Sequence, residues 1–173
     1  MNLNGKQIVE QGIVTNVTNP ECIQQVGVDL ELIKVERVVK GGYVPKQGKT
    51  VLATRETIIP DTVVGQQTES QVWRLEPGVY DITLAQGCKI PANQRLQIIQ
   101  RSSLLRNGAL LVSSMFDPGF ETDKMGTILH VKAPISIEVG ARVGQAYVTE
   151  VNDVDNLYDG QYQKDVQRVA GEG

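Results

Sequence analysis

The sequence contains few of the residues that mark metal-binding or disulfide-rich proteins. Its 173 residues include two cysteines and one histidine. Cys22 and Cys88 lie far apart, and neither belongs to a CxxC or Cys/His pattern. The spacing therefore predicts no zinc site and indicates two reduced thiols in the core. The N-terminus has no pattern of a secretory signal peptide, so nothing indicates a structural disulfide.

Positive charge and long apolar segments are also scarce. The formal net charge is −3 and the sequence pI is about 5.2, so the chain lacks the basic character of a nucleic-acid-binding protein. No apolar run approaches the roughly 20 residues of a membrane-spanning helix. We therefore expect a soluble cytoplasmic protein with no nucleic-acid or membrane partner. An anionic ligand would have to be held by a local cluster of arginines.

Short strands account for most of the pattern that is present. Residues 28–32 alternate apolar and charged side chains, and similar segments follow between turn residues, which indicates an all-β domain. One short helix is expected after an N-cap at Asn4 and before Gly12. The other expected strands are 35–39, 50–53, 57–59, 72–75, 79–84, 95–99, 109–113, 126–131, 135–139 and 144–150.

The length fits a single domain over residues 1–173. Residues 40–72 predict surface hairpins, with loop residues at Pro60-Asp61 and at 65–70. Residues 152–173 are polar and are expected to form a C-terminal tail or lid. Aromatic residues make up 5% of the chain, which is little for a core that must close by itself. Burial at subunit contacts would be one remedy, so this is a weak hint of oligomerisation.

Residues 100–120, QRSSLLRNGALLVSSMFDPGF, carry the clearest chemistry. The stretch opens with Arg101 and two serines, contains a second cation at Arg106, and ends with Asp117 in a Pro-Gly turn. Arginine and serine donate hydrogen bonds in a geometry that phosphate oxygens accept. A carboxylate fixed in a turn at a strand end, yet open to water, is a candidate general base. With an apolar strand between them, these groups predict a nucleotide site.

RSSLLR followed by DPGF resembles the RSSLxR and DPGW or DPGF signatures of the dCTP deaminase branch of the dUTPase superfamily. Five further segments resemble motifs of that family in the same order: 23–30, 75–78, 89–92, 140–145 and 158–163. The resemblance implies a distorted β-barrel or jelly roll that assembles as a homotrimer with shared active sites. It also implies a deoxypyrimidine nucleoside triphosphate as substrate, accompanied by Mg²⁺.

The resemblance assigns roles to residues of this chain. Asp117 would activate the water that attacks the α-phosphorus, and Phe120 would pack on the deoxyribose. Asp29 would help to hold the magnesium that travels with the triphosphate, or brace the site. The remaining residues would hold phosphates or close over the nucleotide: Arg101, Ser102, Ser103, Arg106 and Gln145 for the phosphates, and Tyr158, Tyr162 and Gln163 for the lid. Arg106 and the lid would act on a neighbouring subunit.

Each role has a simpler structural alternative. Arg101 and the serines would form a β-bulge with a surface ion pair, and Arg106 would be a solvated cation before a turn. Asp29 would lie on the exposed side of a strand, and Gln145 would be an ordinary polar strand residue. Asp117 would hydrogen-bond to its own backbone. The tail would be disordered.

Departures from the family motifs separate the possible reactions. The strand that carries a proton-transferring glutamate in the deaminases has Val131 at that position, and a one-residue shift would place His130 there instead. Gln161 replaces a lysine of the lid motif. Since valine transfers no proton, we expect dUTP diphosphatase activity first. The alternatives are dCTP deamination and a nucleotide-binding module without activity.

Overall fold

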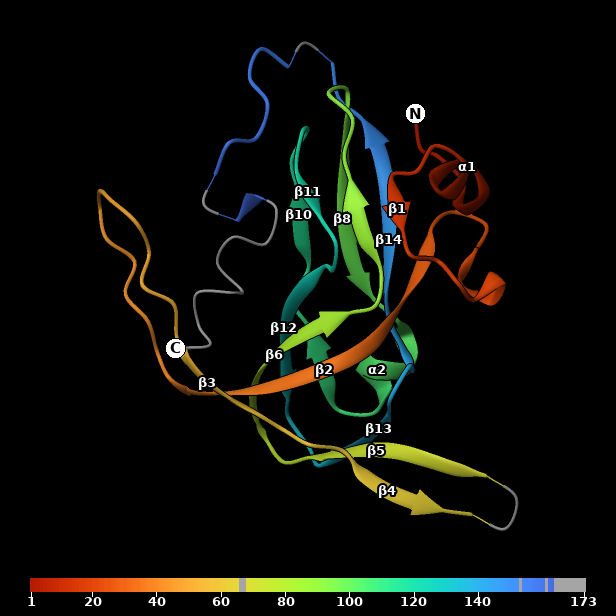
Figure 1. The fold of residues 1–173 in the computed structure, drawn as a ribbon, viewed down its shortest axis with the longest axis vertical. Helices are drawn as coiled ribbons and strands as arrows, with labels where there is room; N and C mark the ends of the chain where they lie inside the picture. Colours follow the sequence, from red (N-terminus) through yellow and green to blue (C-terminus); the bar gives the residue numbers. More distant parts are fainter. Residues whose placement is uncertain (66–67, 153, 161, 164–173) are drawn as a thin grey trace.

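The computed structural model describes residues 1–65, 68–152, 154–160 and 162–163 (Figure 1). Strands make up almost all of its regular structure, which confirms the all-β prediction. The elements in chain order are α1 (Gly5–Glu10), β1 (Val14–Thr15), η1 (Pro20–Cys22), β2 (Val28–Lys40), β3 (Thr54–Thr57), β4 (Asp61–Val64), β5 (Glu69–Leu75), β6 (Gly78–Leu84), β7 (Gly87–Lys89), β8 (Gln94–Gln100), α2 (Ser102–Arg106), β9 (Ala109–Leu111), β10 (Ser114–Phe116), β11 (Glu121–Thr122), β12 (Gly126–Val131), β13 (Ile135–Glu138) and β14 (Arg142–Glu150).

The main sheet is organised around β2, which is its longest strand (Figure 1). The strand order is β10-β8-β14-β2-β6-β12-β9, and β3 pairs with the far end of β2. The first part of β2 pairs with β14, where Asp29 lies opposite Gln145, and the later part pairs with β6. A register shift in each pairing marks a bulge or irregularity, and such features bend and twist a strand. One continuous strand therefore serves both halves of the sheet.

The main sheet curls until its two edges approach each other. β9 and β10 stand at opposite ends of the strand order, yet only Val112 and Ser113 separate them in the chain. Hydroxyl groups bridge this seam: the Ser114 Oγ donates to the Thr127 Oγ1 at 2.7 Å, and the Thr127 Oγ1 donates to the Val112 carbonyl at 2.6 Å. The curled sheet forms a half-barrel, which agrees in part with the distorted barrel that the family resemblance implied.

The interior of the curl is filled mainly by aliphatic side chains. Each fully buried side chain of this kind contributes about 1.5–3 kcal/mol relative to exposure. The residues with no exposed surface include Leu30, Leu32, Val35, Ile82, Leu84, Leu96, Ile98, Leu129 and Val148. Buried Trp73 and Tyr80 donate to the backbone carbonyls of Ile58 and Glu76 at 2.9 and 2.7 Å, so their polar ends are satisfied.

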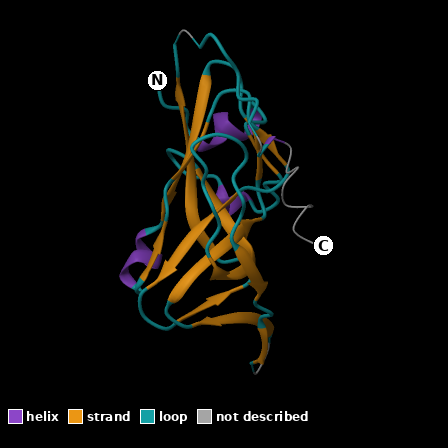
Figure 2. Ribbon diagram, turned by 90° about the vertical axis from the view of Figure 1, so that its left-hand side faces the viewer, coloured by secondary structure: helices purple, strands orange, loops and turns teal. Residues whose placement is uncertain are grey.

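Two further sheets have three strands each, β1-β7-β11 and β13-β5-β4. Strands predominate throughout the fold in Figure 2. The predicted helix α1 is confirmed: Asn4 and Gln7 form a reciprocal capping box, and Gly12 follows with a φ of 67°. Cys22 and Cys88 are both buried, as expected of core thiols. No described helix is long and apolar enough to cross a membrane.

Several predicted boundaries were wrong. Residues 102–106 form the helix α2, in which only Leu104 is buried. Gly108, with a φ of 82°, then lets the chain reverse towards β9. Residues 50–53 contain only a bridge from Val51 to Tyr43, while β4 begins at Asp61, where a loop was expected. The segments predicted at 28–32 and 35–39 are one strand, since the irregularity in β2 hides its continuity in the alternation pattern.

Candidate functional site

Asp29 is the centre of one polar cluster. Its side chain lies on β2 with only 1% of its surface exposed, so the alternative of an exposed strand position is wrong. Gln145, its cross-strand partner on β14, donates from Nε2 to Asp29 Oδ1 at 3.1 Å. A buried carboxylate needs charged or hydrogen-bonding partners, because leaving it unpaired costs far more than burying a neutral group. The other partners of Asp29 are two arginines.

Arg101 and Arg142 approach the same oxygen of Asp29. The Nη1 atom of each guanidinium lies 3.5 Å from Asp29 Oδ2, and each arginine side chain keeps about a third of its surface exposed (33% and 30%). The backbone N–H of Arg101 donates to the Val143 carbonyl at 3.1 Å, which ties the start of α2 to β14. Asp29 thus fixes two cations from different elements while their outer faces remain open to solvent.

The other predicted phosphate ligands lie on α2. Ser102 and Ser103 are exposed in its first turn, and Arg106 is exposed in its last turn. Arg106 forms no ion pair with any residue in the described part of the chain. These donors are therefore available to an anion that approaches from outside.

The turn that contains Asp117 is attached to Ile90 by two backbone hydrogen bonds. The N–H of Gly119 donates to the Ile90 carbonyl at 3.0 Å, and the N–H of Ile90 donates to the Phe120 carbonyl at 2.9 Å. Gly119 has a φ of 85°, which favours glycine. The Asp117 carboxylate is exposed and receives no hydrogen bond from the described residues, so the simpler alternative of a bond to its own backbone does not apply. The turn presents a fixed carboxylate to water.

The C-terminal tail contacts this turn within the same chain (Figure 1). The Tyr158 N–H donates to the Pro118 carbonyl at 2.8 Å. Gln163 donates from Nε2 to the Gly119 carbonyl at 2.9 Å and accepts from the Glu121 N–H at 3.0 Å. Two of the three predicted lid residues therefore meet the turn. Gln161 lies outside the described residues.

Phe120 is the middle ring of an aromatic trio. Its centroid lies 5.2 Å from Phe116 and 5.2 Å from Tyr158, with the Tyr158 contact edge-to-face. Only 7% of Phe120 is exposed, because the tail covers it. Contact between Phe120 and a sugar ring therefore requires the tail to move.

The helix α2, which begins next to the Asp29 cluster, and the turn after β10, which holds Asp117, lie apart in one chain (Figure 1). Phe116 pairs with Leu96, so Asp117 follows beside the start of β8, whereas Arg101 follows its end. A rise of about 3.3 Å per residue separates Asp117 from Arg101 by about 20 Å along β8. A single chain does not bring these two predicted residues into one compact site.

Comparison with known proteins places the chain in a family. A family model described as dCTP deaminase-like matches residues 4–151. The chain belongs to the dCTP deaminase-like family. It is 32% identical over 143 residues to the deoxyuridine 5′-triphosphate nucleotidohydrolase of Methanocaldococcus jannaschii, a match that covers 82% of this chain and 87% of that protein. It is also 32% identical over 166 residues to a probable enzyme of the same name from Aeropyrum pernix, covering 94% and 98%.

A solved structure supports the same fold. The dCTP deaminase of Agrobacterium tumefaciens superposes with a TM-score of 0.63 at 17% identity. The match covers 87% of this chain and 48% of that longer one. At this identity the likeness concerns the fold, which is the dUTPase-like fold that the motifs implied.

β12 is the strand to which the family resemblance assigned the position of the deaminase glutamate. Val131 occupies the predicted position and is 3% exposed, so it points into the core of this dCTP deaminase-like protein. His130 is half-buried on the opposite face of the strand, opposite Val79 and Leu110. Val131 supplies no proton-transferring group. A shift of one residue, which would put His130 at that position, exchanges the two faces of the strand.

The acidic residues do not fit a protein-bound magnesium ion within one chain. No group of three or more His, Cys, Asp or Glu side chains gathers in the described residues. Asp29 lies against two guanidiniums and an amide donor, so a metal ion there would be a third cation and would be repelled. The other predicted role, which is to brace the site, stays a prediction that these contacts support.

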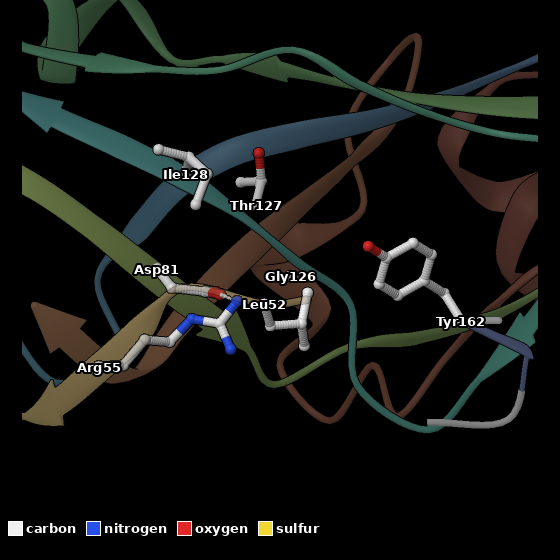
Figure 3. Close-up of a pocket in the computed structure, with 7 residues that line it drawn as sticks. All are labelled: Leu52, Arg55, Asp81, Gly126, Thr127, Ile128 and Tyr162. Carbon is white, nitrogen blue, oxygen red and sulfur yellow. Dashed lines mark ion pairs between the residues drawn. The ribbon is translucent and has the colours of Figure 1, made fainter. Parts of the chain in front are cut away.

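One pocket was missed at the sequence level (Figure 3). It has a volume of about 190 Å³ and is lined by Leu52, Arg55, Asp81, Gly126, Thr127, Ile128 and Tyr162. An ion pair of 2.8 Å joins Arg55 and Asp81 at its wall. Because Thr127 also contacts Ser114, three residues before Asp117, the pocket lies near the turn. Leu52 and Arg55 come from residues 40–72, a stretch without a readable pattern, so no sequence signal indicated them.

Proposed function

We propose that the protein is a dUTP diphosphatase, which converts dUTP and water to dUMP and pyrophosphate. The observation that carries the proposal is the exposed Asp117 carboxylate, held in a turn anchored to Ile90 and free of hydrogen bonds to the described residues. The matched relatives named deoxyuridine 5′-triphosphate nucleotidohydrolases support the same reaction. The arginines at Asp29 supply the charge that a triphosphate requires.

The proposed reaction needs one positioned water and a charged leaving group. Asp117 accepts a hydrogen bond from water and orients its oxygen towards the α-phosphorus. A bond forms between that oxygen and phosphorus, and the bond from phosphorus to the α,β-bridging oxygen breaks with its electron pair leaving on pyrophosphate. The proton of the water passes to Asp117 and then to solvent. Arg101 and Arg106 stabilise the negative charge that accumulates on the leaving phosphates.

We propose further that the active site forms between subunits of a homotrimer. The separation of about 20 Å between Asp117 and Arg101 along β8 supports this arrangement. Rotational symmetry would bring the turn of one subunit to the α2 helix of another, with the same contact repeated around the ring. Each of the three sites would then have both groups of residues.

Magnesium is proposed as a companion of the substrate. Mg²⁺ retains several waters and binds phosphate oxygens with few protein carboxylates. When bound, it would neutralise triphosphate charge. The residues of this chain would hold the phosphates through Arg101, Ser102, Ser103 and Gln145.

A nucleotide panel with two product assays tests the proposal. Wild-type protein should release pyrophosphate from dUTP, and Asp117→Asn should lower the rate by about 10²–10⁴-fold while retaining affinity for a non-hydrolysable analogue. A variant at an exposed acid away from the turn, Asp61→Asn, is the matched control. Binding of dUTP by wild-type protein without any turnover would contradict the proposal and favour a binding module.

Deamination of dCTP is the second candidate, because the family description and the Agrobacterium structure both refer to that enzyme. Water would add to the ring carbon bearing the amino group, and ammonia would leave. Ammonia release from dCTP would support it. Loss of that signal in His130→Ala, with the pyrophosphate signal unchanged, would assign the proton transfer to His130.

A further inference from the structure

Arg142 has no role in the motifs that identified the family. It lies within residues 140–145, where the resemblance pointed to Gln145 and to the turn before it. The structure nevertheless places its guanidinium in the same cluster as Arg101, on the same oxygen of Asp29. The cluster therefore contains one more cation than the sequence motifs predict.

The bulge of β14 explains how Arg142 reaches this position. Arg142 pairs with Glu31 and Gly144 pairs with Leu30, so the register shifts between them. A bulge changes the direction of the side chains that flank it. In a regular strand, two residues that are three positions apart point to opposite faces of the sheet. Because of the bulge, Arg142 and Gln145 instead both reach the Asp29 carboxylate.

The remaining contacts hold the arginine in place and leave room for an anion. Arg142 Nη1 donates to the Glu21 backbone carbonyl at 2.9 Å. Its Nη2 lies 4.0 Å from the Glu21 carboxylate, whose side chain is 77% exposed. Asp29 balances one of the two guanidinium charges, and Glu21 is a loosely held anion beside the second. A phosphate group could take the place of the Glu21 carboxylate at lower cost than that of buried Asp29.

We propose that Arg142 binds the β- and γ-phosphates of the substrate together with Arg101, with Asp29 as the residue that positions both guanidiniums. Glu21 is the exchangeable anion that occupies Arg142 in the absence of substrate. This inference rests on the proposed function for the identity of the nucleotide, but it concerns only triphosphate binding. A purely structural Arg142 would instead serve to attach η1 to β14 through Glu21.

Two opposite charge changes separate these roles. Arg142→Gln should weaken binding of α,β-imido-dUTP by about 10- to 100-fold, the loss typical of a charged hydrogen-bonding partner. Affinity for dUMP, which lacks the β- and γ-phosphates, should change by less than about twofold. Glu21→Gln should tighten binding of the imido analogue, because it removes the competing anion. Arg142→Lys should recover part of the loss, since lysine keeps the charge without the guanidinium fork.

The matched control is Arg74→Gln, which removes one exposed arginine that pairs with Asp61 at 3.6 Å on a different sheet. It should leave both affinities unchanged. Equal loss of dUMP and imido-dUTP binding in Arg142→Gln, or no tightening in Glu21→Gln, would overturn the assignment. If wild-type protein binds imido-dUTP through Arg142 but hydrolyses no dUTP, the proposed function fails and this inference stands.

Discussion

Replacing Asp29 with asparagine should destabilise the fold by about 1–3 kcal/mol. Each guanidinium lies 3.5 Å from Asp29 Oδ2, a distance at which one pair gains about 5 kcal/mol at an effective dielectric constant of 20. Removing one partner of a buried pair costs about 3–5 kcal/mol. The two arginines are about a third exposed, so water screens part of that cost and the smaller range applies. Asparagine retains an oxygen for the Gln145 hydrogen bond.

Urea unfolding of the wild type and of Asp29→Asn measures this difference directly, and the thermal midpoint should fall by about 2–4 °C for each kcal/mol. Asp61→Asn, which breaks an exposed pair with Arg74, is the control and should cost less than about 1 kcal/mol. A double-mutant cycle with Arg142→Gln should give a coupling energy of about 0.5–3 kcal/mol. Additive effects of the two substitutions, or a loss at Asp29 no larger than at Asp61, would refute its bracing role.

The remaining predictions concern the shared site and a buried thiol. Mixed subunits of Asp117→Asn and Arg101→Ala should regain dUTP hydrolysis, because some interfaces then combine both intact residues; no recovery after demonstrated subunit exchange would contradict the shared site. Mixing Asp117→Asn with a chain ending at residue 154 should not restore activity, since the tail contacts its own turn; recovery would show that the tail acts on a neighbour. Burial and the nearby charge of Glu31 raise the pKa of Cys22 to about 11, so its thiol should resist alkylation at pH 8 until the protein unfolds. Because the folded pKa is raised, this group's stabilising effect is complete below pH 9 and disappears as the pH rises through 11.

The parts of the fold that were predicted correctly are mainly strands whose apolar and polar side chains follow the two-residue period of a β-strand. Residues 79–84 and 126–131 are both strands close to their expected bounds, and the burial of residues 126–131 alternates along the strand. The helix α2 was missed because its five residues bury only Leu104 and so carry no helical period. β4 was missed because all four of its side chains are exposed, which removes the apolar signal of a half-buried strand.

The candidate site was only partly predictable, for a similar reason. Motifs identified Arg101, Asp117 and Gln145 by residue type, and sequence order could not show that the first two lie at opposite ends of β8. Arg142 was missed because its orientation depends on a bulge, which leaves no signature in one sequence. The partners of Asp29 could be identified only from the tertiary structure, because Arg101, Arg142 and Gln145 are far from Asp29 in the sequence.

The pairing of β2 with β14 also sets the order in which the protein can become functional during synthesis. A ribosome delivers β2 early, but its partner β14 follows every other strand in the described residues. Contacts between residues so far apart in sequence form slowly, because a long loop must close before they stabilise anything. Until β14 has emerged, Asp29 has neither Gln145 nor Arg142 beside it, and the central edge of β2 stays unpaired. Until β14 emerges, the nascent chain is thus exposed to association through that edge, and the charged cluster around Asp29 is completed only then.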